Sequence, residues 1–303
     1  MLMNEEAKDL DLPEDVFRLI RDLFCHHSGI YLDDEQRDFV KSRLKSSVLR
    51  RQFDNFRDYY FFLKYDRKKD EEIVNLIDVL TIHETYFFRE EEKLKTFSED
   101  LLPEIAKKNH NIKTLRIWSA GCSTGEEPYT ISMLLMEDPR FKDWNIEIVA
   151  TDISQRVVQS ARRGVYKNTS FRTSVPKYLK CFDKYFHKES DGYRIDDSVK
   201  KIVSFFSLNL LDKNRFSFIG PMDIIFCRNV IIYFDINAKK YIAEAFYKKL
   251  RDSGFLVLGH SESLVSISTS FMLRLFEHDL VYQKPAPDKV SVISPEAVSG
   301  EAS

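Results

Sequence analysis

The chain has 303 residues, 43% of them hydrophobic and 31% charged, and its formal net charge is −2. This composition is typical of a folded globular protein, and the near-neutral charge excludes a generally basic nucleic-acid-binding protein. The four cysteines lie far apart without a C-x-x-C pair, so we expect no metal framework and a reducing, cytoplasmic location.

Residues 10–80 are predicted to form a small helical domain. Apolar residues recur at helical spacing between Val16 and Phe24, and Ser28-Gly29 ends this first helix. Further helices are expected at 35–52, 56–65 and 70–80. No apolar run in the chain approaches the roughly 20 residues that a transmembrane helix needs, so we expect no direct membrane insertion.

From residue 114 onward, predicted strands alternate with predicted helices. Strands are expected at 115–119, 146–151, 202–207, 222–227, 254–259 and 280–284, and helices at 126–136, 154–163 and 238–251. This alternation indicates an α/β fold with a mostly parallel sheet and helices on both faces. Residues 171–201 interrupt it with a predicted β-hairpin that turns at Ser190-Asp191-Gly192. Residues 81–113 are expected to be a linker, 114–284 the main domain, and 285–303 a flexible tail.

The run LRIWSAGCSTGEEP at 115–128 predicts a strand, a glycine turn and the start of a helix. The next predicted strand ends at Asp152, whose carboxylate could accept both hydroxyls of a ribose. Glu126 and Glu127 open the helix, where they would exclude a pyrophosphate but tolerate a cationic nucleoside such as S-adenosylmethionine. An ordinary strand–turn–helix remains the alternative for this run.

Two further runs carry polar residues among aromatic ones. HETYFFRE at 83–90 lies between the helical domain and the sheet domain, and taken alone it also fits a hinge. In FCRNVIIYF at 226–234, a buried strand ends at Arg228-Asn229, on the sheet edge where α/β proteins bind ligands. Tyr233 follows within reach of the same edge, although a core aromatic is the simpler interpretation for it alone.

Together with NLL at 209–211 and GHSESL at 259–264, these runs occur in the order found in the CheR-type chemoreceptor methyltransferases, which the chain resembles over about residues 10–284. The resemblance implies a helical N-terminal domain and a Rossmann-like class I methyltransferase domain with a small inserted β-subdomain. It also implies methylation of glutamate side chains on chemoreceptor cytoplasmic helices, with S-adenosylmethionine converted to S-adenosylhomocysteine during adaptation in chemotaxis. One alternative is a non-catalytic signalling protein that binds either compound, and another is a methyltransferase of the same fold that acts on another protein or a small molecule.

The resemblance assigns site residues by position in the motifs. Arg89 and Tyr233 are the expected catalytic residues on the substrate side of the site. Asp152 is expected at the ribose, Glu127 at the methionine end of the cofactor, and Asn209 and Leu210 at the adenine. The full expected cofactor set is His83, Thr85, Arg89, Glu127, Asp152, Asn209, Leu210, Arg228 and Asn229. The family usually has Asn at the position of His83, which puts this contact in question.

A basic helix suggests how the substrate is recognised. Residues 35–57 contain seven basic and three acidic side chains, and we expect this surface to dock an acidic receptor helix, with nucleic acid disfavoured by the net charge. A solvated helix face is the alternative. The proposed docking residues are Arg37, Lys41, Arg43, Lys45 and Arg50. Family members that tether to a receptor pentapeptide have a longer hairpin loop, so we expect no such tether here, and we expect a monomer.

Overall fold

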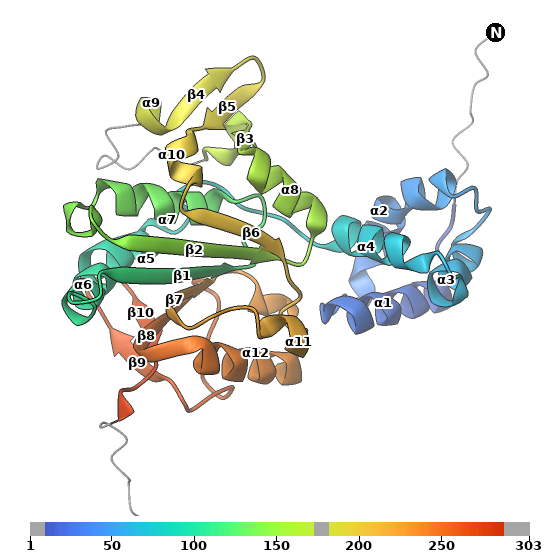
Figure 1. The fold of residues 1–303 in the computed structure, drawn as a ribbon. Coiled ribbons are helices and arrows are strands. Elements are labelled where there is room, and N and C mark those ends of the chain that lie inside the picture. The colour runs from blue at the N-terminus through green and yellow to red at the C-terminus, as the bar shows by residue number, and fades with distance from the viewer. Residues whose placement is uncertain (1–9, 173–181, 288–303) are drawn as a thin grey trace, which may run out of the picture.

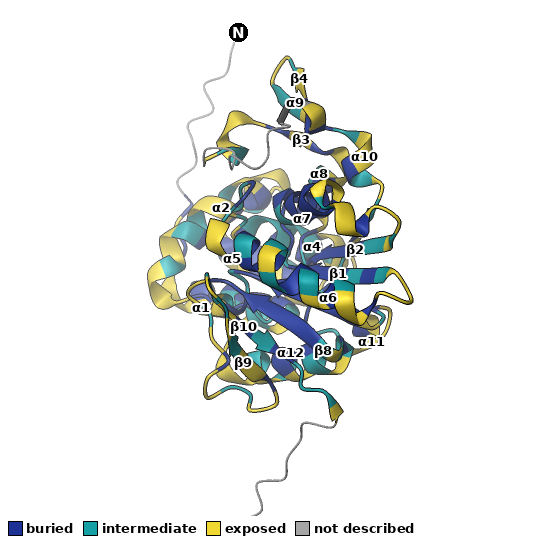
Figure 2. Cartoon of the chain, turned by 90° about the vertical axis from the view of Figure 1, so that its left-hand side faces the viewer, coloured by how far each residue is buried: buried dark blue, intermediate teal, exposed yellow. Residues whose placement is uncertain are grey.

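The computed structural model describes residues 10–172 and 182–287. Figure 1 shows a group of helices beside a larger body, in which helices surround one extended sheet, with a small second sheet at one end. Figure 2 shows that the buried residues concentrate in the extended sheet and on the helix sides that face it. Most of the tail predicted at 285–303 lies outside the described residues. No helix in the described part of the chain is long and apolar enough to span a bilayer.

The predicted N-terminal helices are confirmed as α1 (Glu14–Ser28), α2 (Arg37–Arg50), α3 (Phe56–Tyr65) and α4 (Lys69–Leu80), with a short 3₁₀ turn, η1 (Asp34–Gln36), before α2. The ends of α1 follow local rules. Pro13 precedes its first turn, where an amide hydrogen is not needed, and Gly29 ends it at φ 78° while donating to the carbonyl of Cys25. Apolar residues from all four helices are buried in one cluster.

The large sheet has the strand order β6-β2-β1-β7-β8-β10-β9. The first five strands in this order are parallel, while β10 pairs antiparallel with both β8 and β9. The strands are β1 (Thr114–Ala120), β2 (Asn145–Asp152), β6 (Val203–Ser207), β7 (Met222–Cys227), β8 (Leu250–Leu258), β9 (Met272–Leu275) and β10 (Leu280–Gln283). The mostly parallel sheet is therefore confirmed, and only β9 was missed among its strands.

Alternate residues of each strand face opposite sides of the sheet, so the sheet supports two cores. Ile117 of β1 faces a core with α7 (Glu126–Glu137) and α8 (Gln155–Arg163), whereas Trp118 faces a core with α12 (Ile236–Lys249). The second core is continuous with the helical N-terminal cluster. The prediction of helices on both faces is thus confirmed.

Residues 81–113, expected to be a linker, contain more structure than the sequence suggested. They form α5 (Glu91–Lys95), a π-helical turn η2 (Thr96–Leu101) and α6 (Leu102–Lys108). Leu94, Phe97 and Ile105 from this segment are fully buried against the sheet. The segment therefore helps to build the core of the sheet domain.

The predicted hairpin is confirmed as β4 (Phe186–Glu189) and β5 (Gly192–Ile195), and a third strand, β3 (Val165–Tyr166), pairs with β5. Phe87 of the HETYFFRE run anchors this small sheet. Its ring stacks on Phe171 at 5.1 Å and meets Tyr166 and Phe186 edge-on at 4.8 and 4.9 Å. The small sheet and the HETYFFRE segment are thus packed together.

The remaining short elements are η3 (Pro139–Phe141), η4 (Asn168–Ser170), α9 (Phe182–Tyr185), α10 (Asp197–Lys200), α11 (Lys213–Phe216) and η5 (Ile231–Tyr233).

Contacts on two sides of the pocket illustrate how the helical part joins the sheet domain. Asp78 of α4 accepts hydrogen bonds from the Ser154 hydroxyl at 2.5 Å and from the backbone amide of Arg156 at 3.3 Å, both beside the start of α8. On the other side, Ile30 forms an isolated antiparallel bridge with Phe234. These contacts place the end of α1 over the carboxyl edge of the sheet.

Candidate active site

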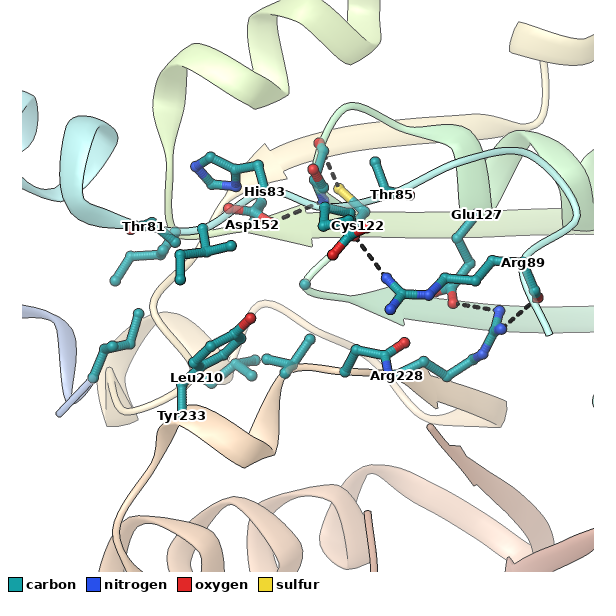
Figure 3. A pocket seen from close by; sticks show the side chains of 18 of the residues that line it. Thr81, His83, Thr85, Arg89, Cys122, Glu127, Asp152, Leu210, Arg228 and Tyr233 are labelled. Carbon is teal, nitrogen blue, oxygen red and sulfur yellow. Dashed lines mark hydrogen bonds and ion pairs between the residues drawn. The ribbon is translucent and has the colours of Figure 1, made fainter. Parts of the chain in front are cut away.

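A pocket opens at the carboxyl ends of β1, β2 and β7, the edge at which parallel α/β sheets bind ligands (Figure 3). The HETYFFRE segment and Ile30 of the helical part cover it. The pocket brings together every residue that the sequence suggested for cofactor binding and catalysis, namely His83, Thr85, Arg89, Glu127, Asp152, Asn209, Leu210, Arg228, Asn229 and Tyr233.

Asp152 ends β2 and is 7% exposed. Its two carboxylate oxygens accept backbone amides, one from Ser123 at 2.8 Å and one from Ser154 at 3.0 Å. These bonds fix the orientation of the carboxylate and leave each oxygen able to accept another hydrogen bond. Burial raises the pKa of Asp152, and the neighbouring His83 opposes this shift. The arrangement suits two vicinal hydroxyls.

The turn after β1 depends on Gly121. Its φ of 83° lies in the left-handed region, and a Cβ there would collide with Cγ2 of Val230. The amides of Gly121 and Cys122 both donate to the carbonyl of Thr151, at 2.7 and 2.9 Å. The turn is thereby held against the end of β2, which leaves room for a ligand beside Asp152.

Glu127 and Arg228 form a buried ion pair at one end of the pocket. Arg228 Nη1 lies 3.1 Å from one oxygen of Glu127, and the Ser119 hydroxyl donates to the other at 2.7 Å. Arg228 also lies 3.3 Å from Glu90. Burial raises the pKa of Glu127 while Arg228 lowers it. This end of the pocket therefore offers paired charges to a ligand that carries both an amine and a carboxylate.

Several buried polar atoms that line the pocket have no hydrogen-bond partner among the described residues. They are His83 Nε2, Ser123 Oγ, Arg228 Nε and Asn229 Oδ1. Unpaired buried polar atoms are uncommon in folded proteins because each one carries a desolvation cost. Their convergence on one cavity indicates a polar ligand there, and S-adenosylmethionine, with its hydroxyls, amine and carboxylate, fits this donor and acceptor set.

Arg89 and Tyr233 both reach into the pocket (Figure 3). Arg89 Nη1 donates to the carbonyl of Glu84 at 2.7 Å, and its guanidinium lies 5.6 Å from the centre of the Tyr86 ring. Arg172 lies 5.5 Å from the centre of the same ring. Burial raises the pKa of Tyr233, so its hydroxyl keeps its proton at neutral pH and can donate a hydrogen bond.

Asn209 has a role that the sequence did not suggest. Its amide nitrogen donates to the carbonyl of His27 at the end of α1 at 2.9 Å, and its amide oxygen accepts the amide of Leu211 at 2.9 Å. The side chain therefore joins the helical part to the sheet domain while Asn209 and Leu210 line the pocket.

Sequence reasoning also missed Glu262. It occurs in the GHSESL run, which was recognised without a role for its acid. The carboxylate accepts four backbone amides, including those of Asn229 and Ile231. The available signal was an acidic residue two positions after His260, close behind the end of a predicted strand.

The proposed docking residues Arg37, Lys41, Arg43, Lys45 and Arg50 all lie on α2, and none of the pocket-lining residues comes from this helix. Arg37 and Arg43 are exposed, whereas Lys41 and Lys45 are half-buried. Arg50 lies 3.2 Å from Glu72, which is buried and also bound by Arg51 and Tyr59. Arg43 is close enough to His83 to help lower the pKa of this imidazole.

The fold and the pocket define a class of protein. A Rossmann-like sheet with a glycine turn after its first strand, an acid at the end of the second, and an acid in the first turn of the intervening helix is the arrangement of a class I S-adenosylmethionine-dependent methyltransferase.

Comparison with known proteins gives the family. Residues 15–81 match the model of the CheR methyltransferase all-alpha domain, and residues 83–280 match that of the CheR methyltransferase SAM-binding domain. The chain therefore belongs to the CheR methyltransferase family. It binds S-adenosylmethionine as its cofactor.

The chain aligns with curated chemotaxis methyltransferases along nearly their whole length. The chain is 36% identical to chemotaxis protein methyltransferase 2 of Vibrio cholerae, covering 90% of this chain and 94% of that protein. It is 37% identical to the chemotaxis protein methyltransferase of Borreliella burgdorferi, covering 83% and 88%. It is 34% identical to that of Salmonella typhimurium, covering 88% and 89%.

Proposed function

We propose that this protein is a protein-glutamate O-methyltransferase that methylates glutamate side chains on the cytoplasmic helices of chemoreceptors. The products are glutamyl methyl esters and S-adenosylhomocysteine. The observation that carries the proposal is that Arg89 and Tyr233 share one pocket with Asp152 and Glu127 in a chain of the CheR family. A cofactor site and two groups able to orient a carboxylate therefore adjoin each other.

The chemistry needs positioning more than acid–base catalysis. A glutamate side chain is already ionised at neutral pH, so no strong base is required to create the nucleophile. S-adenosylmethionine supplies a methyl group on a sulfonium, which is a good leaving group. Aligning the carboxylate oxygen with the methyl carbon and the sulfur is then the main task, and such alignment can contribute several kcal/mol.

Arg89 and Tyr233 are suited to this alignment. Arg89 is held by the carbonyl of Glu84 and by the Tyr86 ring, so its guanidinium enters the pocket already oriented. Too tight a pair with the substrate would weaken the nucleophile, and part of the Arg89 donor capacity is satisfied by Glu84. Tyr233 donates a hydrogen bond to the incoming carboxylate, because its hydroxyl remains protonated.

The substrate would dock on α2. Arg37 and Arg43 are exposed there, and the charge of Arg43 contributes to the lowered pKa of His83 in the pocket wall. An acidic receptor helix laid along this surface would reach the pocket from the side of the helical domain. Arg50 is the weakest member of the proposed docking set because it is already paired with Glu72.

The deciding experiment is methyl transfer from labelled S-adenosylmethionine to receptor-containing membranes, followed by mild base. We expect base-labile label that is released as methanol, as carboxyl methyl esters require. Binding of S-adenosylhomocysteine in calorimetry without any transfer would favour the alternative, a non-catalytic signalling protein.

We expect no tether between this protein and a receptor C-terminal pentapeptide. Strand β4 ends at Glu189 and strand β5 begins at Gly192, so only Ser190 and Asp191 separate them. This tight turn offers no extended loop for a peptide. Calorimetry with such a peptide should give no binding at micromolar concentration, and a micromolar complex would contradict this expectation.

A further inference from the structure

Four backbone amides converge on the carboxylate of Glu262. One oxygen accepts the amides of Gly259 and Asn229, both at 2.7 Å, and the other accepts those of Val230 and Ile231, both at 2.8 Å. Strands β7 and β8 are adjacent and parallel, so the loops that follow them leave the same sheet edge. Glu262, on the loop after β8, therefore holds the loop after β7.

The loop after β7 has the shape of an anion site. Asn229 has a φ of 60°, in the left-handed region that few residues other than glycine adopt, although Asn tolerates it better than most. This conformation turns successive amides toward one point, as in the backbone nests that bind anions. Here the anion is a side chain of the protein, and its charge stabilises a backbone conformation that would otherwise be unfavourable.

The surroundings of Gly259 independently support a close contact between the Glu262 carboxylate and the Asn229 amide. A Cβ at this position would lie 2.7 Å from the nearer Glu262 oxygen and 2.8 Å from the Asn229 amide nitrogen. Only a residue without a side chain leaves room for the carboxylate and the amide to meet.

The residues carried by the held loop are those of the pocket. Arg228 pairs with Glu127, Asn229 presents an unpaired amide oxygen, Val230 packs where a Cβ on Gly121 would lie, and Tyr233 ends η5. Glu262 accepts three backbone amides of this loop, and among the described residues no other side chain makes as many hydrogen bonds to it. A shift of the carboxylate would thus move several pocket residues together.

We propose that Glu262 is a positioning residue for cofactor binding and methyl transfer, acting through the loop of residues 228–233. For its turnover part, this inference rests on the proposed function. For its binding part, it needs only the cofactor pocket. Glu262 is not among the residues that line the pocket, whereas Asn229 and Tyr233 are, so its effect passes through them.

The test compares Glu262→Gln with Glu244→Gln in the full-length protein. In Glu262→Gln an NH₂ group replaces one carboxylate oxygen, and in either orientation its N–H groups face two backbone donors. Glu244 is an exposed residue of α12 paired with Lys248, so it loses the same charge far from the pocket. We expect Glu262→Gln to bind S-adenosylhomocysteine at least roughly tenfold more weakly and to lower kcat about 100-fold, because displacements on the order of 1 Å have effects of that size.

The readouts separate positioning from folding. Partial unfolding would lower the active fraction in calorimetry without changing the affinity of the folded molecules, whereas a displaced loop changes the affinity itself. The KM for receptor membranes should stay within about twofold of the wild-type value, because none of the residues that line the pocket belongs to α2, and Glu244→Gln should change nothing by more than about twofold. Wild-type affinity and kcat in Glu262→Gln would overturn the inference.

A second variant applies if Glu262→Gln does not fold. Gly259→Ala keeps the carboxylate but places a methyl group between it and the Asn229 amide, and we expect the same weakening of S-adenosylhomocysteine binding. Unchanged affinity in this variant would also overturn the inference. If the wild-type protein binds S-adenosylhomocysteine but methylates no receptor, the proposed function fails, while the affinity comparison still decides the role of Glu262.

Discussion

Tyr233 lies at the end of η5, in the loop that Glu262 holds, and it is half-buried in the pocket wall. Its raised pKa keeps the hydroxyl protonated, and Arg89 is near enough to oppose that shift. At the scale of single residues, the proposed mechanism therefore depends on one hydroxyl and one guanidinium that adjoin the same space. Each can be removed separately.

We expect Tyr233→Phe to lower kcat by about 10- to 100-fold, the size expected for one hydrogen bond to a charged group. The affinity for S-adenosylhomocysteine should hardly change, because the aromatic ring remains. Single-turnover methyl transfer to receptor membranes measures the first quantity and calorimetry the second. Tyr241→Phe on α12 is the control, and an equal loss in both variants would count against a catalytic role for Tyr233.

We expect His83 to give the pocket a dependence on pH. Burial lowers its pKa, Arg156 and Arg43 lower it further, and Asp152 and Asp78 oppose them. The folded-state pKa lies below the unfolded value, so the unfolded chain binds the proton first as the pH falls. The contribution of this group to stability is therefore complete above about pH 6.5 and is lost as the pH falls through the lowered pKa.

The same titration should affect cofactor binding. A protonated His83 would attract the Asp152 carboxylate away from a ribose and would repel a sulfonium. We expect the affinity for S-adenosylmethionine to fall between about pH 7.5 and about pH 5.5, and to fall less in His83→Asn. Calorimetry at both pH values, with both proteins, isolates the part due to the imidazole. Identical slopes would show that other groups cause the whole effect.

At the scale of elements, the pocket depends on the turn between β1 and α7. Gly121→Ala would force a side chain into the left-handed region and into Val230. We expect a loss of about 1–3 kcal/mol in the free energy of unfolding, measured by urea denaturation, together with weaker cofactor binding. Gly220→Ala is the matched control, because its Cβ would meet only the flexible end of Arg116. A stable Gly121→Ala protein with normal affinity would contradict this account.

Periodicity in the sequence predicted most elements of this fold, because helices α1 to α4 and the parallel strands have strong local patterns. It missed β9, whose residues are mostly exposed and show no clear alternation. It also missed α5 and α6, where the residues after HETYFFRE were assigned to a linker although Leu94 and Phe97 are buried. Their burial depends on the sheet they pack against, which local sequence does not reveal.

The candidate site, like the fold, could be predicted from the sequence only in part. Asp152, Arg228 and Asn229 could be placed at one pocket because strand ends of a parallel sheet meet at one edge. The hydrogen bond from Asn209 to His27 and the four amides bound by Glu262 could not be predicted, because they join segments far apart in the sequence. These long-range bonds determine how the pocket residues are held.

At the scale of the whole molecule, the basic surface of α2 and the pocket belong to different parts of the chain. If α2 docks the receptor, Arg37→Glu with Arg43→Glu should lower kcat/KM for receptor membranes at least roughly tenfold and weaken its dependence on salt. The affinity for S-adenosylhomocysteine should not change. Lys107→Glu with Lys240→Glu alters the charge equally at exposed positions on α6 and α12, and should leave kcat/KM nearly unaltered.

The pocket is completed by Ile30, and Asn209 ties its lining to the end of α1. A ligand in the pocket would therefore contact both the helical part and the sheet domain. If a receptor docks on α2 and these contacts couple it to a nucleoside in the pocket, each must change the affinity of the other by the same factor. With such a coupling, the release of product and the release of the receptor after methyl transfer would influence each other.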